Sequence, residues 1–529
     1  MVPESHRAAA VEEGQSRDLL LRRADWRFLL PDPHPQWSVC YAGGRLSRAT
    51  VLVSQEIVSP VEAMPGSCGL AVVSDPDART LQAAWEALCP GGMLYGEWYS
   101  PLTGGPPQIR GQVERAGFRA THSYWPWPWP DRGATLFWLP LEAPAALDYF
   151  LISRPPSQSL LEGVFRSILR PAWKLARQAR LLVPVCVTAR KPAASSPHPE
   201  SQDDDLLQAV REGWQAWGFG RRPDSLYWLM LTGGLTSINK VVKFAFNASD
   251  RAPRLVVKHA RVPESIPALV REAENLDSLE GLPEGGPPNV PRLLFLKQSQ
   301  EAFALGETVV NGNPLYTLLR GENYRSLALK ATAWLGQLVT RGPPIPRSEW
   351  WARIGGPALD AFERKFGQEL GAGLVERIKD QLLSLEALPA AFEHRDFSPW
   401  NVLVTDTGQL AVLDWEGGEP HGLAGMDLIY FLTFLAFFHD GAMETGEFRP
   451  AYRSAQDPES FTGSVQAECL RIYFEALGLN SGIARPLRTL AWTIHSLSIF
   501  PRLGSPVDRN GEEDVTPFIQ LLVEELGGG

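Results

Sequence analysis

The spacing of apolar and polar residues changes several times along the chain. Across residues 25–150, strand-like runs alternate with helical ones, as in WSVCYAGG, ATVLVSQE, GLAVVSD and LQAAWEALCPGGMLYGEW, followed by ERAGFRATHSYWPWP and ATLFWLPL. Alternation of this kind is typical of a parallel α/β sheet. The pattern therefore predicts an α/β domain over residues 25–150, preceded by an N-terminal extension of residues 1–24.

This periodicity stops at ARKPAASSPHPESQDDD, residues 189–205, whose Pro, Ser, Ala and charged residues predict a flexible linker. After it, LLQAVREGWQAW predicts a helix, and two β-rich runs, YWLMLTGGLTSINKVVKFAFN and PRLVVKHAR, are joined by turn residues at 248–253. The helical run PALVREAENLDSLEGL and the apolar runs VPRLLFL and AFALGETVV come next, and the chain is mainly helical from Leu315. This order predicts a small β-rich lobe over residues 206–314 and a larger helical lobe over residues 315–529.

Residues 151–188 form a basic segment. Five cations recur at three- and four-residue spacing, and on a helix they share one face: Arg166, Arg170, Lys174, Arg177 and Arg180. One interpretation is contact with an anionic membrane surface through residues 163–182. The preferred interpretation is a solvated basic face, because Pro171 interrupts the helix.

Length and cysteine content set the class of protein. A chain of 529 residues exceeds the size at which single cores stop growing, about 250–300 residues, so two domains are expected. The five cysteines are scattered and form no CxxC pair or Cys/His cluster, which favours a reducing cytoplasm over a secreted disulfide framework. No apolar run approaches the roughly 18–20 residues of a membrane span; the longest covers residues 428–438.

Charge is distributed unevenly. Residues 1–200 carry a net charge of +2 and residues 201–529 a net charge of −12. So acidic a C-terminal half argues against nucleic acid as a partner. It would favour a cationic substrate, although a solvated acidic surface is the preferred interpretation.

The strongest chemical signal lies in FEHRDFSPWNVLVTDTGQLAVLDWEGGE, residues 392–419. His394, Asp396 and Asn401 form an H-x-D-x4-N pattern, and Asp414 follows at the end of an apolar run. A loop of this length places one carboxylate where it accepts a proton from a substrate hydroxyl, while the amide and the second carboxylate face the metal that bridges nucleotide phosphates. Mg²⁺ needs few protein oxygens besides phosphate and water.

This segment resembles the catalytic loop and metal-binding strand of the aminoglycoside phosphotransferase and choline kinase-like superfamily, which shares the protein-kinase fold. The resemblance covers about residues 204–529. It implies that Asp396 is the catalytic base, that Asn401 and Asp414 are magnesium ligands, that His394 supports the loop, and that Glu416 is a further carboxylate near the metal.

Three further residues bear on this resemblance. Asp427 matches a family Asp that hydrogen-bonds the catalytic loop, with a plain helix N-cap as the alternative. Arg395 replaces the Gly that is common between the His and the Asp in aminoglycoside kinases. There is no DFG or APE motif, because Asp414 lies in LDWEGG, so small hydroxylated molecules such as sugars, aminoglycosides or amino alcohols are favoured over protein substrates.

The nucleotide side is predicted from the segments upstream. The turn TGGLTSINK, residues 232–240, contains Gly233, Gly234 and Ser237, and its backbone amides are expected to approach phosphate. Lys258, at the end of the run LVV, is expected to reach the α- and β-phosphates of ATP. The alternative for the turn is a purely structural hairpin connection.

Two acidic residues compete as the partner of Lys258. Glu272 lies in the helix ALVREAENL and is preferred over Glu274 because of the family-like REAxxL pattern. The segment GETVVNGNPL, residues 306–315, resembles the connection between the lobes, so backbone groups from Glu307 to Val309 are expected to meet the adenine ring.

In the N-terminal half, CPGGMLYGE and ERAGF resemble the second half of class I S-adenosylmethionine-dependent methyltransferases. The cofactor end departs from that family, because only Gly43 and Gly44 follow the first strand and Glu56 arrives early for a ribose-binding carboxylate. A degenerate domain that binds a sugar precursor or supports the kinase is therefore preferred over a methyltransferase. WPWPWP, residues 125–130, is interpreted as a stiff aromatic loop packed on the sheet, with stacking on a sugar as the alternative.

The sequence thus predicts an α/β plus α+β protein: a Rossmann-like domain followed by a two-lobed protein-kinase-like domain. The expected activity is ATP- and Mg²⁺-dependent phosphorylation of a small-molecule hydroxyl. The alternatives are a pseudokinase that only binds ligands, and methyl transfer by the N-terminal domain. Retention of Lys258, Asp396, Asn401 and Asp414 argues against the pseudokinase.

Overall fold

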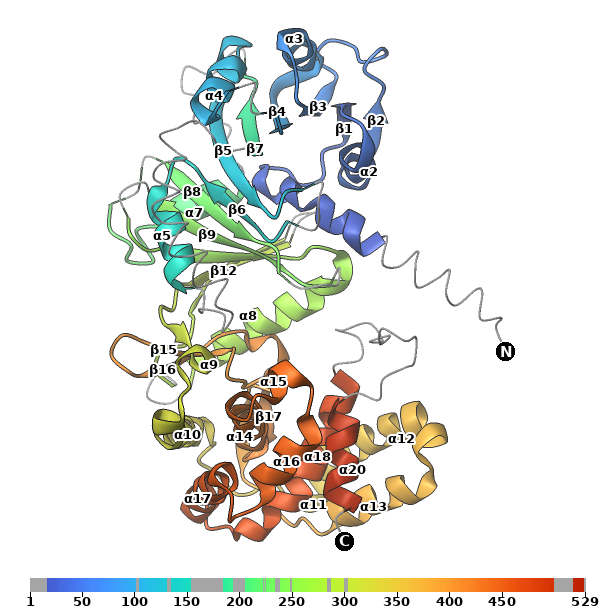
Figure 1. The fold of residues 1–529 in the computed structure, drawn as a ribbon, viewed down its shortest axis with the longest axis vertical. Coiled ribbons are helices and arrows are strands. Elements are labelled where there is room, and N and C mark those ends of the chain that lie inside the picture. Colours follow the sequence, from blue (N-terminus) through green and yellow to red (C-terminus); the bar gives the residue numbers. More distant parts are fainter. Residues whose placement is uncertain are drawn as a thin grey trace. The chain divides into compact units, whose positions relative to one another are not determined.

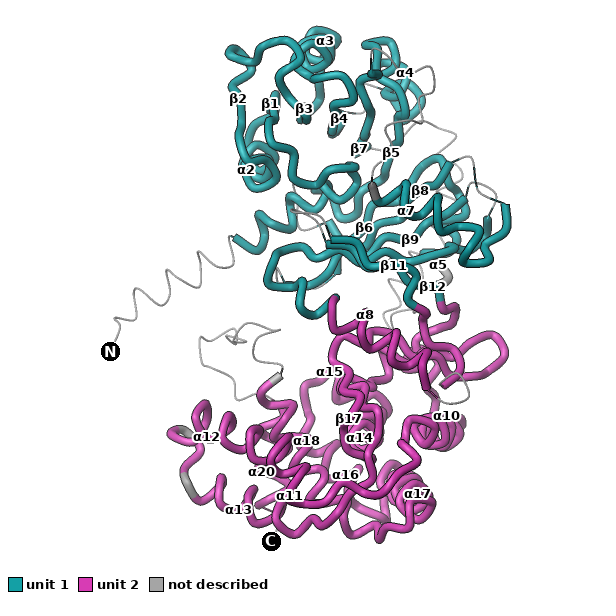
Figure 2. The backbone as a smooth tube through the Cα atoms, turned by 180° about the vertical axis from the view of Figure 1, so that it is seen from behind, with its two compact units in different colours: residues 1–269, 293–309 teal, residues 270–292, 310–529 magenta. Residues whose placement is uncertain are grey.

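The structure of the protein is a computed structural model. It describes residues 17–100, 104–130, 135–153, 184–193, 205–221, 223, 225–233, 238–247, 250–282, 287–298, 303–498 and 517–527. The chain divides into two compact units: unit 1 comprises residues 1–269 and 293–309, and unit 2 comprises residues 270–292 and 310–529 (Figure 2). Each unit is described separately below.

Unit 1 is built on one sheet of 12 strands, in the order β11-β12-β10-β9-β8-β6-β5-β7-β4-β3-β1-β2 (Figure 1). In chain order the strands are β1 (Trp37–Tyr41), β2 (Glu56–Val58), β3 (Cys68–Ser74), β4 (Leu88–Trp98), β5 (Arg119–Trp127), β6 (Phe137–Pro140), β7 (Val185–Arg190), β8 (Leu226–Leu231), β9 (Val241–Asn247), β10 (Leu255–His259), β11 (Leu293–Gln298) and β12 (Phe303–Thr308). The protein is therefore a mixed α/β structure with a large sheet.

The first four strands confirm the predicted parallel pairing. β1 pairs in parallel with β2 and β3, and β3 with β4. Parallel neighbours need a crossover connection, and α2 (Gly44–Val53) and α3 (Ala78–Ala87) supply two of these. The Val-rich run ATVLV, which favours a strand locally, forms the end of α2, where Ala49, Thr50 and Val53 are buried at three- and four-residue spacing on one helix face.

Beyond β4 the sheet is antiparallel. β7 lies between β4 and β5, so the sheet includes a strand from residues 185–190 that the predicted boundary at residue 150 leaves out. VCVTAR forms this strand because its β-branched residues favour an extended chain, although residues 185–188 were predicted to belong to the basic helical segment and residues 189 and 190 to the linker. The predicted basic helix and most of the predicted linker, residues 154–183 and 194–204, lie outside the described residues.

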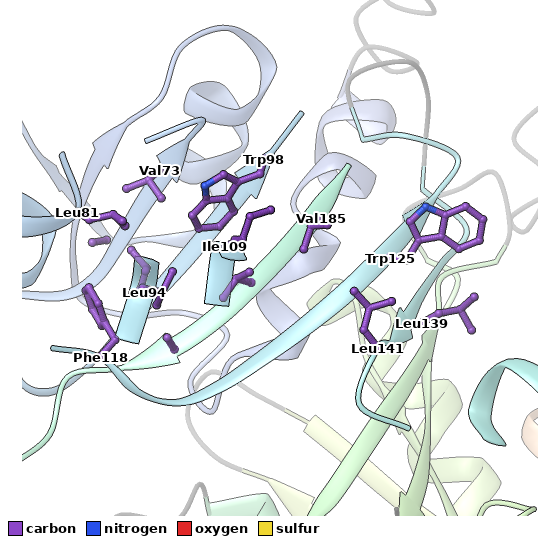
Figure 3. Packing of buried hydrophobic residues seen from close by; sticks show 14 of the residues in the cluster. Val73, Leu81, Leu94, Trp98, Ile109, Phe118, Trp125, Leu139, Leu141 and Val185 are labelled. Atoms are coloured by element: carbon purple, nitrogen blue, oxygen red, sulfur yellow. The ribbon is translucent and has the colours of Figure 1, made fainter. Parts of the chain in front are cut away.

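One core of unit 1 packs helices against this sheet. Figure 3 shows Val73 of β3, Leu94 of β4 and Val185 of β7 in the same buried cluster, with Leu81 from α3 and Ile109 from α4 (Pro106–Arg115). Trp125 of WPWPWP, 8% exposed, belongs to this cluster and lies 5.6 Å from Trp127 between ring centroids. The predicted burial is confirmed for Trp125, but residues 125–127 belong to strand β5 itself and do not form a loop packed on the sheet.

The same sheet continues into the strands predicted for the small kinase lobe. β6 pairs antiparallel with β8, with Phe137 opposite Leu231 and Trp138 opposite Met230. β8, β9, β10, β12 and β11 then follow, all antiparallel. The predicted helix after the linker is α7 (Asp205–Gly213). The two predicted domains therefore share one sheet within unit 1.

Buried ion pairs connect the N-terminal segment to this sheet. Asp25, in the short helix Asp25–Leu29, accepts hydrogen bonds from Arg261 at 2.9 and 3.0 Å, and both side chains are fully buried. Arg23 donates to Glu97 of β4 at 2.7 Å with both oxygens engaged. Trp26 stacks on Tyr95 at 4.1 Å. Residues from Arg23 onward are thus part of the packed unit, although the sequence placed residues 23 and 24 in the extension.

Replacing Asp25 tests this connection. Asp25→Ala leaves the guanidinium of Arg261 buried without its carboxylate, so we expect the free energy of unfolding to fall by roughly 3–5 kcal/mol. Urea denaturation followed by tryptophan fluorescence measures the change. The control is Glu114→Ala, which removes the exposed pair with Arg110 and should alter stability by less than about 1 kcal/mol. Equal losses in the two variants would contradict the buried-pair argument.

Unit 2 is mainly helical, as predicted from Leu315 onward. Its longer helices are α10 (Gly321–Leu335), α12 (Gly356–Leu370), α13 (Ala372–Leu383), α14 (Met426–His439), α16 (Phe448–Gln456), α17 (Phe461–Ala476), α18 (Ala484–Ser498) and α20 (Pro517–Gly527) (Figure 1). Two small sheets accompany them: β13 (Asn313–Pro314) with β15 (Val402–Val404) and β16 (Leu410–Val412), and β14 (Ala390–Glu393) with β17 (Glu419–Leu423).

Helix α14 is the central helix of this unit. Eleven of its fourteen residues are buried, including most of the apolar run at 428–438. A helix that is apolar on all sides needs neighbours all round, and α10, α16 and α18 pack against it. In the part of the chain that the structure describes, no helix combines the length and apolarity of a membrane span.

Candidate active site

The H-x-D-x4-N loop connects the two small sheets of unit 2. β14 ends at Glu393, directly before His394, and β15 begins at Val402, directly after Asn401. Asp414 follows β16, which pairs with β15. The four polar residues that the sequence singled out in this segment therefore lie on one small framework.

Asp396 is held by two side chains. Asn401 Nδ2 donates to Asp396 Oδ2 at 2.9 Å and to its backbone carbonyl at 3.0 Å. The hydroxyl of Tyr430, on α14, donates to Asp396 Oδ1 at 3.2 Å. Both oxygens of a half-buried carboxylate are thus oriented by hydrogen bonds to its ionised form, which is the form that accepts a proton.

His394 joins the catalytic loop to the segment of Asp414. Its Nδ1 accepts the backbone N–H of Asp396 at 3.2 Å, so the ring proton must lie on Nε2, which is 2.8 Å from the carbonyl of Leu413. The ring is fully buried and lies edge-on to Trp415 at 4.5 Å. A neutral histidine with this tautomer supports the loop, in agreement with the role that the resemblance implied for it.

Asp427 anchors the loop from α14. Its carboxylate accepts the backbone N–H groups of His394, at 2.5 Å, and of Arg395, at 2.9 Å. The residue at the N-cap of α14 is Gly425, so Asp427 does not act as a plain cap. The family-like interpretation of Asp427 is therefore confirmed. Burial raises its pKa to about 7, the nearby Glu393 adds to the increase, and the two N–H donors oppose it.

Asn401 and Asp414 carry oxygens of the kind that Mg²⁺ prefers, and their role as magnesium ligands stays a prediction. Because Nδ2 of Asn401 is the atom that donates to Asp396, its Oδ1 atom is the one that faces other partners, and amide and carboxylate oxygens are ligands that Mg²⁺ prefers. The N–H of Leu413 donates to the Asn401 carbonyl at 3.0 Å. This hydrogen bond brings the backbone just before Asp414 next to Asn401, although the two residues are far apart in the sequence. Asp414 adopts a left-handed conformation with φ of 65°, a strained state typical of functional sites.

Helix α8 (Ile266–Glu280) holds the segment after Asp414. Asn275 donates to the carbonyls of Trp415, at 2.8 Å, and Gly418, at 3.1 Å. Arg271 donates to the carbonyl of Glu416 at 3.3 Å. The part of α8 from Val270 onward belongs to unit 2, so the predicted metal-binding segment has its support within that unit.

The two candidate partners of Lys258 on α8 differ in burial. Glu272 is 1% exposed, whereas Glu274 is exposed. An acidic residue that is buried needs a charged or hydrogen-bonding partner, which favours Glu272. Pairing of Glu272 with Lys258 stays a prediction.

Lys258 has a partner that the sequence analysis did not identify. Its ammonium lies 2.9 Å from Glu307 Oε1, and both side chains are nearly buried. β10 and β12 are antiparallel neighbours, with Val256 opposite Glu307. Glu307 is a strand residue with β10 and β11 on its two sides, and its side chain holds Lys258. Contact of its backbone with the adenine ring stays a prediction.

The other residues predicted to bind the nucleotide follow strands β8 and β12 or lie outside the described residues. Gly233 is exposed just after β8, at the start of the turn to β9, and a Cβ there would meet open space. Gly234 and Ser237 lie outside the described residues. Val309 follows β12, and the chain passes from unit 1 to unit 2 directly after it.

Comparison with protein families agrees with this site. Residues 239–461 match the model of the phosphotransferase enzyme family, APH. This region is a phosphotransferase-family domain. The matched region contains Lys258 and the whole of the loop from His394 to Asp427. No curated protein matches the chain.

Three of the solved structures that are similar to part of this chain are described as aminoglycoside phosphotransferases or a putative fructosamine kinase. The ADP-bound aminoglycoside phosphotransferase APH(2'')-Ib is 14% identical, with a TM-score of 0.32, and the match covers 60% of this chain and 96% of that one. APH(3'')-Id from Streptomyces rimosus is 16% identical, with a TM-score of 0.33 and coverage of 54% and 98%. A putative fructosamine-3-kinase from Haemophilus somnus is 14% identical, with a TM-score of 0.35 and coverage of 61% and 97%. Because these sequence identities and TM-scores are low, the assignment of residues 239–461 to the phosphotransferase family rests on the family model alone.

Three residues of the site were not predicted in their roles. Tyr430 orients Asp396, Glu393 pairs with Arg395 at 3.1 Å, and the side chain of Glu307 holds Lys258. Tyr430 and Glu307 meet partners that are distant in sequence, whereas Glu393 and Arg395 lie two residues apart and no motif marks their pairing. Tyr430 lies one helical turn after Asp427, on the same side of α14, which is the only signal that was available.

The raised pKa of Asp427 predicts how stability depends on pH. The folded carboxyl binds its proton up to about pH 7, whereas the ordinary pKa is 3.8. Stability therefore falls as pH rises through this window, by at most about 1.4 kcal/mol per pH unit. Asp427→Asn removes this titration, so we expect a flatter dependence of the Tm on pH between pH 5 and 8. Asp406→Asn, at an exposed position, serves as control; an unchanged slope in Asp427→Asn would refute the assignment.

Proposed function

We propose that the protein is an ATP-dependent, Mg²⁺-requiring phosphotransferase that acts on a hydroxyl group of a small molecule. One observation carries the proposal: Asn401 and Tyr430 orient the carboxylate of Asp396, while His394 ties the same loop to the segment of Asp414. The family match over residues 239–461 supports it.

In the proposed reaction Asp396 acts as the base. The oxygen of the acceptor hydroxyl forms a bond to the γ-phosphorus of ATP, and the bond from that phosphorus to the β,γ-bridging oxygen breaks, so ADP leaves. The hydroxyl proton passes to Asp396 Oδ1 or Oδ2. Since phosphoryl transfer needs positioning and charge stabilisation more than covalent assistance, a fixed carboxylate is the principal requirement on this side.

The phosphates of ATP are assigned to the remaining residues of the predicted site. Asn401 and Asp414 would hold Mg²⁺, with Glu416 as a further carboxylate; the ion, when bound, neutralises charge that develops on the phosphate oxygens. Lys258, held by Glu307, would bind the α- and β-phosphates. The turn at residues 232–240 would cover the phosphates through its backbone amides.

The pseudokinase alternative is disfavoured by the hydrogen bonds on Asp396. A module that only binds ligands has no need for a base oriented at both oxygens. The methyltransferase-related interpretation of residues 25–150 rests on sequence resemblance, with four parallel strands as its structural support. We propose that this region chiefly supports the phosphotransferase domain through the shared sheet.

Replacing the base tests the proposal. Asp396→Asn keeps the shape of the side chain but removes its basicity, so we expect the turnover number to fall by roughly 10²- to 10⁴-fold with ATP affinity nearly unchanged. The assay is ATP-dependent phosphorylation across a panel of sugars, aminoglycosides and amino alcohols. Asp406→Asn is the matched control and should remain active, because Asp406 is an exposed carboxylate between β15 and β16.

Undiminished turnover by Asp396→Asn would exclude Asp396 as the base. Methyl transfer from S-adenosylmethionine by the full-length chain, unaffected by Asp396→Asn, would instead assign an activity to the N-terminal region.

Removing the metal gives a second test. Asp414→Asn removes one negative charge from the proposed metal site. In the presence of Mg²⁺ we therefore expect the Kd for ATP to rise at least about tenfold, which corresponds to a loss of roughly 1.4 kcal/mol in binding free energy. In EDTA the variant and the unaltered protein should bind ATP equally. Calorimetry under both conditions measures this; a loss of the same size in EDTA would show that Asp414 contacts the nucleotide without a metal.

A further inference from the structure

A cavity of about 390 Å³ lies in unit 2 next to the catalytic loop. This volume falls within the range of small-molecule sites. Its apolar lining comes from Ile354, Ala358, Ile494 and Leu497, and its charged lining from Arg353, Arg395 and Glu419. These residues belong to five segments of unit 2: the turn Trp351–Gly355, α12, α18, the catalytic loop and β17.

Two connections relate this cavity to Asp396. Arg395 precedes Asp396 in the loop, and its backbone N–H is fixed by Asp427. On α18, Ile494 precedes His495, whose ring stacks on Tyr430 at 4.3 Å, and Tyr430 donates to Asp396. The cavity is therefore lined by a sequence neighbour of Asp396 and by a sequence neighbour of His495, the residue that stacks on Tyr430.

The guanidinium groups at the cavity retain hydrogen-bonding capacity. Arg395 Nε donates to Glu393 at 3.1 Å, but its Nη2 is 3.8 Å from Glu419, too far for a hydrogen bond. Arg353 donates one bond to Glu349 at 3.0 Å and one to the carbonyl of His421 at 3.1 Å. Because a guanidinium has five N–H donors, both groups keep donors for a ligand.

The backbone at Arg395 adds a separate observation. Its φ is 61°, in the left-handed region that glycine adopts freely and that disfavours a residue with a Cβ. An arginine stands in this position and contributes its side chain to the cavity. Strain of this kind is found where the side chain has a function.

We propose that this cavity binds the phosphate acceptor and that the acceptor carries an anionic group, a carboxylate or a phosphate, which Arg353 and Arg395 bind. The proposal rests on the proposed function and narrows its substrate class. Glu349 accepts one hydrogen bond from Arg353 and Glu393 accepts one from Arg395, while Glu419 forms only a long ion pair with Arg395, so both guanidinium groups keep N–H donors for an anion. Guanidinium groups bind carboxylate and phosphate in a planar, bidentate manner, while the apolar wall accommodates the carbon skeleton.

The first test compares acceptors that differ only in charge: glucose, glucosamine, glucuronate and glucose 6-phosphate, together with glycerol and glycerate. We expect the anionic member of a series to exceed its neutral parent at least tenfold in kcat/KM. Arg353→Gln should abolish that preference mainly through KM, and Arg353→Lys should restore part of it. Preference for the cationic or neutral member, or an equal loss for charged and neutral acceptors in Arg353→Gln, overturns the proposal.

The second test needs no turnover. Phenylglyoxal modifies arginines, and mass spectrometry of the full-length protein measures the rate at each site. Inorganic phosphate should slow modification of Arg353 and Arg395 at least several-fold. It should not protect Arg471, which is exposed and pairs with Glu475 four residues away, as Arg353 pairs with Glu349. Equal protection at Arg471, or no protection at Arg353, overturns the anion site.

Together the two tests separate this inference from the proposed function. Absence of transfer to every acceptor, with ATP bound, counts against the phosphotransferase, while the protection assay still decides whether the cavity binds anions. Protection by phosphate without any effect of acceptor charge would show that the site takes a free anion, and the acceptor assignment would be wrong.

Discussion

The carboxylate of Asp427 is the contact on which the candidate site depends. It accepts two consecutive backbone N–H groups, those of His394 and Arg395, from a position buried at the start of α14. Two adjacent amides that share one carboxylate fix the direction of the chain as it leaves β14. Asp396 follows directly, so the orientation of the proposed base is set by a helix whose remaining surface is packed in the core of unit 2.

From that anchor the other polar contacts follow in order. His394 uses one ring nitrogen for the N–H of Asp396 and the other for the carbonyl of Leu413. Asn401 closes the loop on Asp396, and its backbone carbonyl accepts the N–H of Leu413. The proposed base and the proposed metal ligands are thereby linked by hydrogen bonds within one short loop and the two strands, β15 and β16, that follow it.

Unit 1 is held together by strand pairing and a buried ion pair. Its 12 strands form one sheet because β6 pairs with β8, which joins strands from the α/β region to those that carry Lys258. The buried pair between Asp25 and Arg261 adds a second connection, three residues beyond Lys258. Removal of either partner leaves the other charge buried and unpaired. The N-terminal segment that carries Asp25 therefore stabilises the chain just after β10, where Arg261 lies. The α/β region thus supports the strands that carry Lys258.

The sequence alone determined the features that depend on local spacing. The H-x-D-x4-N pattern and Asp414 identified the loop, the apolar runs predicted the helical character after Leu315, and strand-helix alternation predicted the parallel strands β2, β1, β3 and β4. These signals survive because each is set by neighbours within a few residues. Only the tertiary structure decided which residues meet across long separations: Glu307 with Lys258, Tyr430 with Asp396, β7 between β4 and β5, and Asp25 with Arg261. Such contacts arise from the packing of whole elements, which no local pattern of side chains encodes.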